Sequence, residues 1–417
     1  MKYHAGSRRR AIEYERAIAE WWKKDRTFEK SIKQRDIDNS YVFYDGPPFI
    51  TGMPHHGTLL SSIVKDVVPR FWTMRGKRVE RRWGWDCHGL PAENFVEKQL
   101  GITDRRQIGA PEGTPGGISL ESYILKAKES MVANSETWRG TIDRIGRWVD
   151  FDNSYRTMNK DFMESVWWAF KTLYEKGKIY EGRKVLMYDT KFATPVSKAE
   201  VTMDNDAYKT VTDPSAFVLF SAFNSGLFSG AITANDFSAK LYLLAWTTTP
   251  WTLPANKALA VNRDMEYGVY EVEGKKMVVA VKMAEKVFGE KVEPIETFKG
   301  EKLVGVEYED LFHRGGKKKV FGVDFVGEEE GTGIVHIAPA YGEDDYNLYL
   351  EHSDEIEFED VLDENGYYLS EISSALKNLG VRDTDENGIE IWAGNKFIAK
   401  VLEERGVVYK IEYIKHE

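Results

Sequence analysis

Residues 41–58 read YVFYDGPPFITGMPHHGT, and this stretch decides the fold class of the chain. Its apolar start, residues 41–45, predicts a short buried strand, and the Gly- and Pro-rich remainder predicts a loop, because glycine and proline interrupt helices and strands. A helix is predicted from Thr58 to Gly76, because apolar residues recur there at helical spacing and glycine commonly follows a helix end. A second strand is predicted at 79–83. A strand, a helix and a strand in this order form a βαβ unit, so we expect the two strands to be parallel.

The rest of the chain changes character near residue 204. Before it, helices are predicted at 8–24 and 165–180, and residues 119–178 have a mostly helical pattern. After it, short runs rich in Val, Phe, Tyr and Ile alternate with turn residues, which predicts a β-rich domain of barrel-like or sandwich-like form. The predicted strands are 216–223, 241–246, 258–261, 267–272, 276–281, 319–326, 333–337 and 409–414, with a helix at 396–405. We expect an α/β frame that carries this β domain as an insertion. One βαβ unit cannot make a complete sheet, so the frame itself is expected to be incomplete.

Length and composition set the broad class. The chain has 417 residues, enough for two to three domains, and its net charge is 57 − 67 = −10. An acidic balance argues against a generally basic nucleic-acid-binding protein, although a local basic patch is compatible with it. Cys87 is the single cysteine, so neither an internal disulfide nor a Cys-x-x-Cys zinc site is possible. The charged start has no signal-peptide pattern, and the apolar runs are too short to span a membrane, so we expect a cytoplasmic protein.

The four residues His55-His56-Gly57-Thr58 lie between the first predicted strand and the helix. The N-terminus of a helix offers free N–H groups and a partial positive charge, which favour phosphate, and a glycine lets a ligand approach the backbone closely. In open parallel sheets, ligands bind beyond the carboxyl ends of the strands. The spacing alone therefore leaves two interpretations open, a nucleotide-phosphate site and a capped surface turn.

Residues 44–58, taken with 82–93 (RWGWDCHGLPAE), resemble the isoleucyl-tRNA synthetases, which are class I aminoacyl-tRNA synthetases. The resemblance implies an incomplete Rossmann-like nucleotide-binding parallel sheet. It also implies a reaction in which the carboxylate of isoleucine attacks the α-phosphate of ATP. ATP would bind with Mg²⁺ as the substrate complex, and no metal site is expected in this chain. Thr58 stands where the family signature has a second histidine. The residues implied are His55, Gly57 and Thr58 for ATP, and Pro47 and Asp86 for the amino acid, with Asp86 pairing with its α-ammonium group.

Two further stretches have unusual composition. Residues 246–256 read WTTTPWTLPAN, and residues 331–345 read GTGIVHIAPAYGEDD. Three adjacent threonines are common in strands, but the two prolines that follow end a strand, so the hydroxyl groups are expected to line a turn or the rim of a pocket. The acidic residues at 343–345 are compatible with a solvated helix cap, whereas a metal site would need a second set of ligands nearby.

Both stretches match the inserted editing domain of the isoleucine, valine and leucine enzymes. This resemblance implies hydrolysis of the ester bond in valyl-tRNA. Such a second site is needed because one methylene is worth only about 1–3 kcal/mol to a hydrophobic pocket, the isoleucine enzyme being the standard example. By resemblance, the terminal ribose, the misattached amino acid and the attacking water are held by Thr247, Thr248, Thr249 and Asn256. Asp345 would anchor the α-ammonium group, and His336 would help to exclude isoleucine while admitting valine.

The resemblance implies three segments. Residues 1–203 correspond to the N-terminal helix, the first half of the catalytic domain and a helical connection, 204–395 to the editing domain, and 396–417 to a truncated return to the catalytic domain. The second family signature, Lys-Met-Ser-Lys-Ser, does not occur in the sequence. We therefore expect a fragment or one half of a split enzyme, a poor ligase by itself. Its partners would be isoleucine, ATP, the acceptor end of tRNA and a missing C-terminal half. The alternatives are a free-standing editing hydrolase and a non-catalytic tRNA-binding half.

Overall fold

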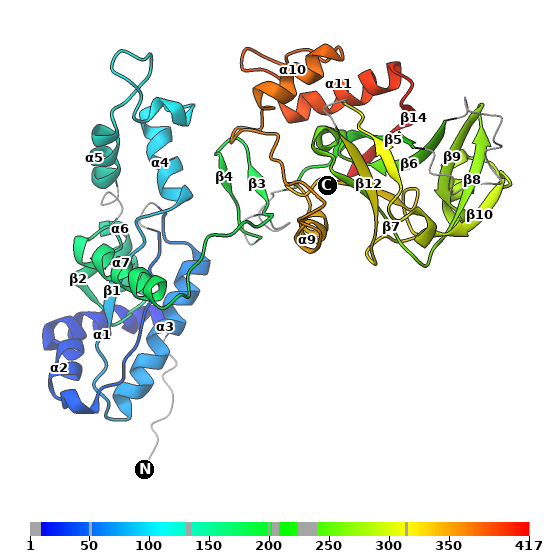
Figure 1. Cartoon of the computed structure of the whole chain (residues 1–417). Helices are drawn as coiled ribbons and strands as arrows, with labels where there is room; N and C mark the ends of the chain where they lie inside the picture. The colour runs from blue at the N-terminus through cyan, green and yellow to red at the C-terminus, as the bar shows by residue number, and fades with distance from the viewer. Residues whose placement is uncertain are drawn as a thin grey trace. The chain divides into compact units, whose positions relative to one another are not determined.

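The computed structural model describes residues 10–49, 52–130, 135–198, 201, 208–223, 240–312 and 316–416. The chain divides into two compact units, Met1–Glu181 and Gly182–Glu417 (Figure 1). The predicted domain boundaries at 203/204 and 395/396 remain predictions.

The first unit is built of helices around a small parallel sheet. Its strands β1 (Arg82–Trp85) and β2 (Asp150–Arg156) pair in parallel. Its helices are α1 (Ala11–Asp25), α2 (Thr27–Lys33), α3 (His56–Met74), α4 (Leu90–Leu100), α5 (Leu120–Ser130), α6 (Ser135–Arg144) and α7 (Lys160–Glu175). The helices predicted at 8–24, after Thr58 and at 165–180 are confirmed as α1, α3 and α7, with shifted ends. The mostly helical pattern predicted for residues 119–178 is wrong at residues 150–156, which form the strand β2.

Residues 40–49 lie beside residues 78–86 in the parallel direction that the βαβ pattern predicts. Isolated bridges join Ser40 to Arg78 and Phe49 to Asp86. A strand at 41–45 is nevertheless wrong, because no continuous ladder forms between these two bridges. At the end of that run, the Asp45 carbonyl accepts a hydrogen bond from the Tyr155 hydroxyl (3.0 Å) instead of from a strand N–H.

The core of the first unit is aromatic. Trp83 and Trp85 of β1 are buried against Trp138 of α6, and the Trp83 ring stacks on Phe151 of β2 with centroids 4.9 Å apart. By contrast, the apolar faces of α3 and α7 are exposed. Their large exposed side chains include Leu60, Val64, Val67 and Phe71 on α3, and Val166, Trp167, Trp168 and Phe170 on α7. The predicted helices are therefore present, but none of the described residues covers these apolar faces.

The second unit is built around a ten-stranded mixed sheet with the order β10-β8-β9-β6-β5-β11-β12-β7-β13, to which β14 is added beside β5. Two pairs are parallel, β6 with β9 and β7 with β12, and the other pairs are antiparallel. The strands are β5 (Val211–Ala222), β6 (Leu241–Thr247), β7 (Ala258–Val261), β8 (Glu266–Val272), β9 (Lys275–Ala280), β10 (Glu296–Lys299), β11 (Glu307–Glu309), β12 (Lys317–Gly322), β13 (Ile334–Ile337) and β14 (Val408–His416). A short hairpin, β3 (Tyr188–Asp189) with β4 (Thr194–Pro195), precedes them.

The strands predicted for the β-rich part are confirmed, and β10 and β11 were missed. In the described residues the path from β10 to β13 does not close on itself, so the barrel-like form is not confirmed. The chain combines helices and strands and is therefore of the α/β class. The alternation of strands and turns was predictable because most of these strands, such as β6, β7 and β13, are largely buried and therefore rich in apolar residues.

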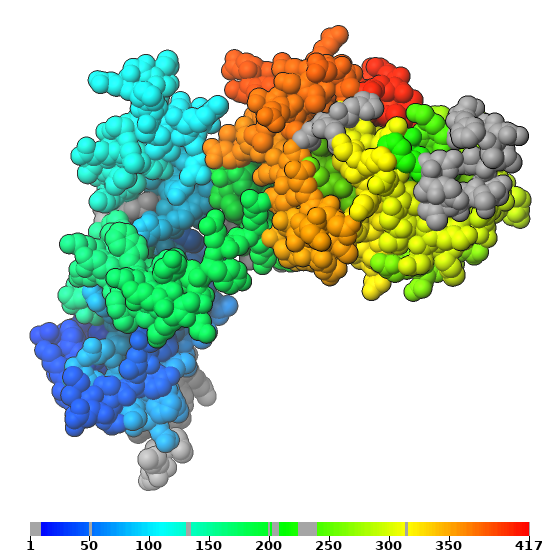
Figure 2. All heavy atoms as spheres, in the orientation of Figure 1, coloured from blue at the N-terminus to red at the C-terminus, as the bar shows by residue number. Residues whose placement is uncertain are grey.

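Helices surround the second sheet. They are η4 (Pro250–Ala255, a 3₁₀ helix), α8 (Ala284–Phe288), α9 (Glu343–Glu351), α10 (Ser370–Asn378) and α11 (Ile391–Glu404). Helix α11 packs against η4, β5 and β14, and α10 and α11 form part of the outer surface of this unit (Figure 2). Residues 396–417 thus continue the second unit through α11 and β14. No helix within the described ranges combines the length and the hydropathy that crossing a membrane requires.

Candidate functional site

A cavity of about 370 Å³ in the second unit collects most of the polar residues singled out in the sequence. Its size is within the usual range for small-molecule sites. Its polar wall includes Thr247, Thr248, Thr249, Thr252, His336 and Asp345, and its apolar wall includes Trp246, Phe325, Val326, Val335 and Tyr341. The two sequence stretches that are about ninety residues apart therefore face one space.

The threonine run bends because β6 ends at Thr247 and η4 begins at Pro250. Thr249 precedes η4, where its N–H donates to the Thr247 hydroxyl oxygen (3.1 Å). Proline at the first position of a helix costs no hydrogen bond, because that N–H would be unpaired. The chain therefore leaves the strand abruptly, and three consecutive hydroxyl groups border the cavity.

His336 on β13 is held in the wall of the cavity from two sides. Its Nε2 lies 2.7 Å from the Thr252 hydroxyl, and its Nδ1 lies 3.3 Å from the Asn256 amide nitrogen. Burial, assisted by the positive charge of Lys318, lowers the pKa of His336 to about 4. The imidazole is therefore neutral near pH 7. Asn256 does not line the cavity; it lies behind His336 and is 2 % exposed.

Asp345 lies in the first turn of α9, and its carboxylate accepts a hydrogen bond from the Ala338 N–H (2.7 Å). Burial raises the pKa of Asp345 to about 6, and the charge of the exposed neighbour Asp344 adds to the rise. The carboxylate is still mostly ionised at neutral pH. The sequence also allowed these acidic residues to be a solvated helix cap. That interpretation fits Glu343 and Asp344, which are exposed, but not Asp345.

Three residues of this site were not singled out in the sequence. Thr252 is part of the quoted threonine-rich stretch and could have been included for its hydroxyl group. Tyr308 donates a hydrogen bond from its hydroxyl to the Asn256 side-chain oxygen (2.8 Å), and Lys318 donates to the Asn256 carbonyl (2.6 Å). These two come from the short strand β11 and from β12, and no sequence pattern connects them with the threonine run.

The residues predicted to bind ATP and the amino acid are in the first unit. The loop that carries Pro47 starts at Asp45, whose carboxylate forms ion pairs with Lys65 of α3 (2.8 Å) and with Arg147. Lys65 also donates to the Gly46 carbonyl (2.5 Å). Pro47 follows directly, so the backbone around it is fastened to the helix that comes after the loop. Residues 50 and 51 of the quoted motif lie outside the described residues.

Asp86 follows β1 and lies beside this loop. Its N–H donates to the Pro48 carbonyl (2.9 Å), and its carboxylate accepts the N–H of His88 (3.4 Å). Among the described residues Asp86 forms no ion pair, and it is half-buried. A backbone hydrogen bond thus joins Asp86 to Pro48, the residue after Pro47, and the amino-acid pocket stays a prediction.

His55 and Thr58 form the N-terminal cap of α3. The Thr58 hydroxyl accepts the His55 N–H (3.0 Å) and donates its own hydrogen to the His55 carbonyl (2.8 Å). The His55 ring lies so close to Gly57 that a Cβ there would be 3.1 Å from the ring. In the described part of this unit, no hydrogen bond joins these three residues to Pro47 or Asp86. The capped turn is therefore present, and the contacts with ATP stay a prediction.

Residues 17–330 match the family described as tRNA synthetases class I (I, L, M and V). The chain belongs to this family. The matched range includes the loop at Pro47, Asp86 and the threonine run, and it ends before His336 and Asp345.

Relatives of this class I synthetase chain have a common name. This chain is 40 % identical over 420 residues to the isoleucine–tRNA ligase of Corynebacterium diphtheriae, and the match covers 96 % of this chain and 37 % of that protein. It is 44 % identical over 342 residues to the isoleucine–tRNA ligase of Mycobacterium tuberculosis, and that match covers 80 % of this chain and 31 % of the relative. The chain thus spans about a third of the length of these relatives.

Two solved structures are also similar to this synthetase chain. The editing domain of P. falciparum cytosolic leucyl-tRNA synthetase has a TM-score of 0.37 and 11 % identity, with 48 % of this chain and 99 % of that chain covered. The corresponding domain from P. knowlesi has a TM-score of 0.35 and 13 % identity, with 48 % of this chain and 97 % of that chain covered.

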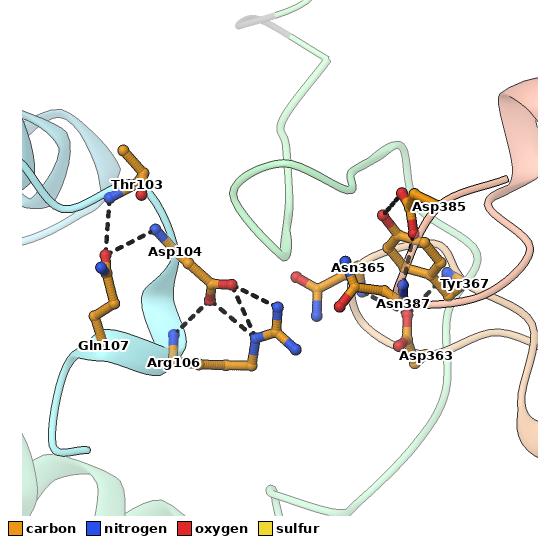
Figure 3. Close-up of polar contacts among 9 residues, drawn as sticks. All are labelled: Thr103, Asp104, Arg106, Gln107, Asp363, Asn365, Tyr367, Asp385 and Asn387. Carbon is orange, nitrogen blue, oxygen red and sulfur yellow. Dashed lines mark hydrogen bonds and ion pairs between the residues drawn. The ribbon is translucent and has the colours of Figure 1, made fainter. Parts of the chain in front are cut away.

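Other polar clusters of the synthetase chain serve to turn loops (Figure 3). In the first unit, the Gln107 side-chain oxygen accepts the N–H groups of Thr103 (3.0 Å) and Asp104 (3.1 Å). In the second unit, Asp363 accepts the N–H of Tyr367 (2.9 Å), whose hydroxyl donates to Asp385 (2.7 Å). Across the described ranges, no group of three or more His, Cys, Asp and Glu side chains has an arrangement that could hold a metal ion.

Proposed function

We propose that this chain is the front part of an isoleucine–tRNA ligase and that its second unit hydrolyses valyl-tRNA. The observation that carries the hydrolytic part is the cavity that brings the threonine run, His336 and Asp345 together. The relatives named isoleucine–tRNA ligase, at 40–44 % identity, support the choice of amino acid. In this proposal residues 204–395 are the editing domain, inserted into an incomplete Rossmann-like frame that begins with residues 1–203. Residues 396–417, which pack on the second unit through α11 and β14, are the truncated return towards that frame.

The proposed roles follow from the chemistry of each side chain. Ionised Asp345 binds the α-ammonium group of the esterified valine, because a partly buried carboxylate with one N–H partner retains capacity for a charge-assisted hydrogen bond. The hydroxyl groups of Thr247, Thr248 and Thr249 hold the terminal ribose and the attacking water. Water attacks the ester carbonyl, the ribose hydroxyl leaves with a proton, and valine and tRNA are the products.

His336 acts in this proposal as a neutral wall rather than as a strong base. Its pKa of about 4 is far below neutral pH, and general-base catalysis is most effective when the pKa lies near the operating pH. The rate would therefore come mainly from positioning of the water and from electrostatic stabilisation. The imidazole, fixed by Thr252 and Asn256, limits the space for the amino-acid side chain and so disfavours isoleucine.

For the first unit, we propose activation of isoleucine within the full-length enzyme. ATP, bound with Mg²⁺ as substrate, would contact His55 and Gly57 at the start of α3, where free N–H groups favour phosphate. Contact with Thr58 would require its hydroxyl to turn away from the His55 carbonyl. Asp86 would pair with the α-ammonium group of isoleucine, and the backbone next to Pro47 would form the adjoining wall.

The hydrolytic proposal is tested by incubating the 417-residue chain with valyl-tRNA and measuring release of valine. We expect turnover by the wild type, loss of turnover in Asp345→Ala, and retention in Asp344→Ala, which changes the exposed neighbour. Equal hydrolysis by Asp345→Ala and the wild type would contradict the assignment. Binding of tRNA without turnover would favour the alternative of a non-catalytic tRNA-binding half, and turnover independent of any further segment would fit a free-standing hydrolase.

The activation proposal requires the longer enzyme of which this chain is a part. In that enzyme we expect Asp86→Ala to remove isoleucine-dependent pyrophosphate exchange, because the α-ammonium group loses its charged partner. Exchange at the wild-type rate would refute the role of Asp86. A matched control is Asp150→Ala, an acidic residue of the same small sheet that we assign no contact with substrate.

A further inference from the structure

A small cavity lies in the first unit, next to the loop that leads to Pro47. Its volume is about 10 Å³, which is about the space that one water-sized particle needs. The carboxylate of Asp45 lines it together with four positively charged side chains, those of Lys65, Arg81, Arg82 and Arg147. The residues that we propose to contact ATP and the amino acid do not line it, so it is a separate place in the fold.

Arg81 is the side chain of this cavity whose hydrogen-bond donors are not all used. It is 5 % exposed, and its Nη2 donates to the Thr73 hydroxyl (2.6 Å). Its Nε and Nη1 are buried and have no acceptor among the described residues. A buried donor without an acceptor costs folding free energy, and the cost is larger when the group is charged. Native structures contain few such groups, so these two N–H groups indicate an acceptor that the described residues do not supply.

Asp66 is the carboxylate that acts most strongly on Arg81, but it is engaged with other groups. It accepts hydrogen bonds from the Arg70 side chain (2.5 Å) and from the Trp148 N–H (3.1 Å). Burial lowers the pKa of Arg81 to about 10; the charge of Asp66 opposes this shift, and three nearby arginines reinforce it. The positive charge of Arg81 is therefore not fully compensated by its surroundings.

Asp45, the carboxylate in the cavity wall, is also engaged. Its Oδ1 lies 2.8 Å from Lys65 Nζ, and its Oδ2 pairs with Arg147. In the described part of the unit it accepts no hydrogen bond from Nε or Nη1 of Arg81. The charged side chains around the cavity therefore have an excess of three positive charges.

The charge and the donors of this wall favour an anion over water. A water molecule could donate one hydrogen to Asp45, but its second hydrogen would face positively charged donors. A small anion accepts from every donor around it, and it also offsets the excess positive charge, which counts for more in a buried place than in water. The volume of the cavity favours a monoatomic anion, because phosphate, sulfate and carboxylates are larger. Arg82 is exposed, so this side of the wall can adjust to chloride, which is slightly larger than water.

We propose that this cavity binds one chloride-sized monovalent anion, which accepts from Nε and Nη1 of Arg81 and lies between Lys65 and Arg147. The anion provides Arg81 with the negatively charged acceptor that Asp66 and Asp45 do not provide. It also lies beside the ion pairs of Asp45, which fasten the start of the loop. The first unit is then stabilised by the ion, and this binding does not depend on either proposed enzymatic activity.

The direct test is a crystal structure of the full 417-residue chain grown in sodium bromide, because bromide takes the place of chloride and scatters anomalously. We expect an anomalous peak within hydrogen-bond distance of Nε or Nη1 of Arg81 in the wild type. The peak should be lost in Arg81→Met, which keeps an unbranched apolar chain and removes the charge and the donors. A wild-type structure with a water molecule at Arg81, or with no anomalous peak there, would overturn the proposal.

Thermal unfolding provides a second test, in sodium chloride and in sodium gluconate of equal ionic strength, since gluconate is too large for the cavity. When chloride exceeds its dissociation constant several-fold, we expect the wild type to unfold about 2–4 °C higher in chloride. Arg78→Met, which replaces an arginine outside the cavity, should respond like the wild type. Arg81→Met should unfold at one temperature in both salts, whatever its own stability. An equal response of Arg81→Met and the wild type would contradict the site, and if Arg81→Met did not fold, the bromide structure of the wild type would decide.

Discussion

Asp345→Asn should stabilise the protein at alkaline pH while it removes the group proposed to bind the ammonium of the substrate. The carboxyl group has a pKa of about 6 in the folded chain against a reference value of 3.8, so it binds its proton more tightly when folded. Ionisation at pH 8 therefore costs folding free energy. The asparagine oxygen can still accept the N–H of Ala338, so the substitution removes the charge and keeps the hydrogen bond.

The size of the effect follows from the shift of the pKa. One pKa unit corresponds to about 1.4 kcal/mol, so a rise from 3.8 to about 6 gives at most about 3 kcal/mol of extra unfolding free energy for Asp345→Asn at pH 8. At pH 5 the folded wild type is mostly protonated at this site, and the gain should fall to about half of that value. Below the unfolded pKa both states carry the proton, and the gain should disappear.

The assay is urea denaturation of the wild type and Asp345→Asn at pH 8 and pH 5. Asp344→Asn is the matched control, because it removes a charge from the exposed neighbouring position in the same helical turn. The reasoning would be refuted if Asp345→Asn were no more stable than the wild type at pH 8. It would also be refuted if Asp344→Asn raised the unfolding free energy by as much as Asp345→Asn does. A gain that grew towards acid pH would also contradict it, because the sign of the linkage would be reversed.

Three further outcomes are expected. The rate of valyl-tRNA deacylation should rise with pH through about 6 as Asp345 ionises, and a flat profile from pH 5 to 8 would contradict its role. Thr58→Val should lower the stability of the start of α3 by about 1 kcal/mol through loss of the cap, seen as faster amide hydrogen exchange there; Thr58→Ser should exchange like the wild type. Gly331→Ala should destabilise the second unit by about 1–2 kcal/mol, because its φ of +77° disfavours a side chain. Gly327→Ala, where a Cβ meets nothing within 4 Å, is its control, and coincident unfolding curves would contradict this expectation.

The fold was most predictable where strands are fully buried. The bounds of β7 agree with the predicted run 258–261, because all four residues are apolar and inaccessible to solvent. The strand β2 was missed because its sequence, DFDNSYR, is polar, and it is specified by pairing with β1 rather than by its own residues. Strands β10 and β11 were missed for a related reason, since they are short and carry exposed or half-exposed charged residues.

The candidate site could be predicted only in part from the sequence. The hydroxyl-rich turn and the His336–Asp345 segment were each recognisable, but that they border one cavity depends on β6 and β13 lying close together in the folded sheet. The hydrogen bond from Tyr308 to Asn256 could not be predicted, because one tyrosine in a three-residue strand carries no pattern. The burial that raises the pKa of Asp345 but leaves Asp344 exposed is likewise a property of the folded chain.

The exposed apolar face of α7 carries two of the twelve tryptophans of the chain, and they differ optically from the three in the core of the same unit. Trp167 and Trp168 are 70 % and 71 % exposed, whereas Trp83, Trp85 and Trp138 are each 1 % exposed. The first pair should emit at longer wavelength and be quenched by acrylamide, and the buried three should resist quenching. Any molecule that covers α7 would shield the first pair from quencher and leave the buried three unchanged. Association at this helix should therefore be visible as a loss of quenchable tryptophan emission, which Trp167→Phe with Trp168→Phe would abolish.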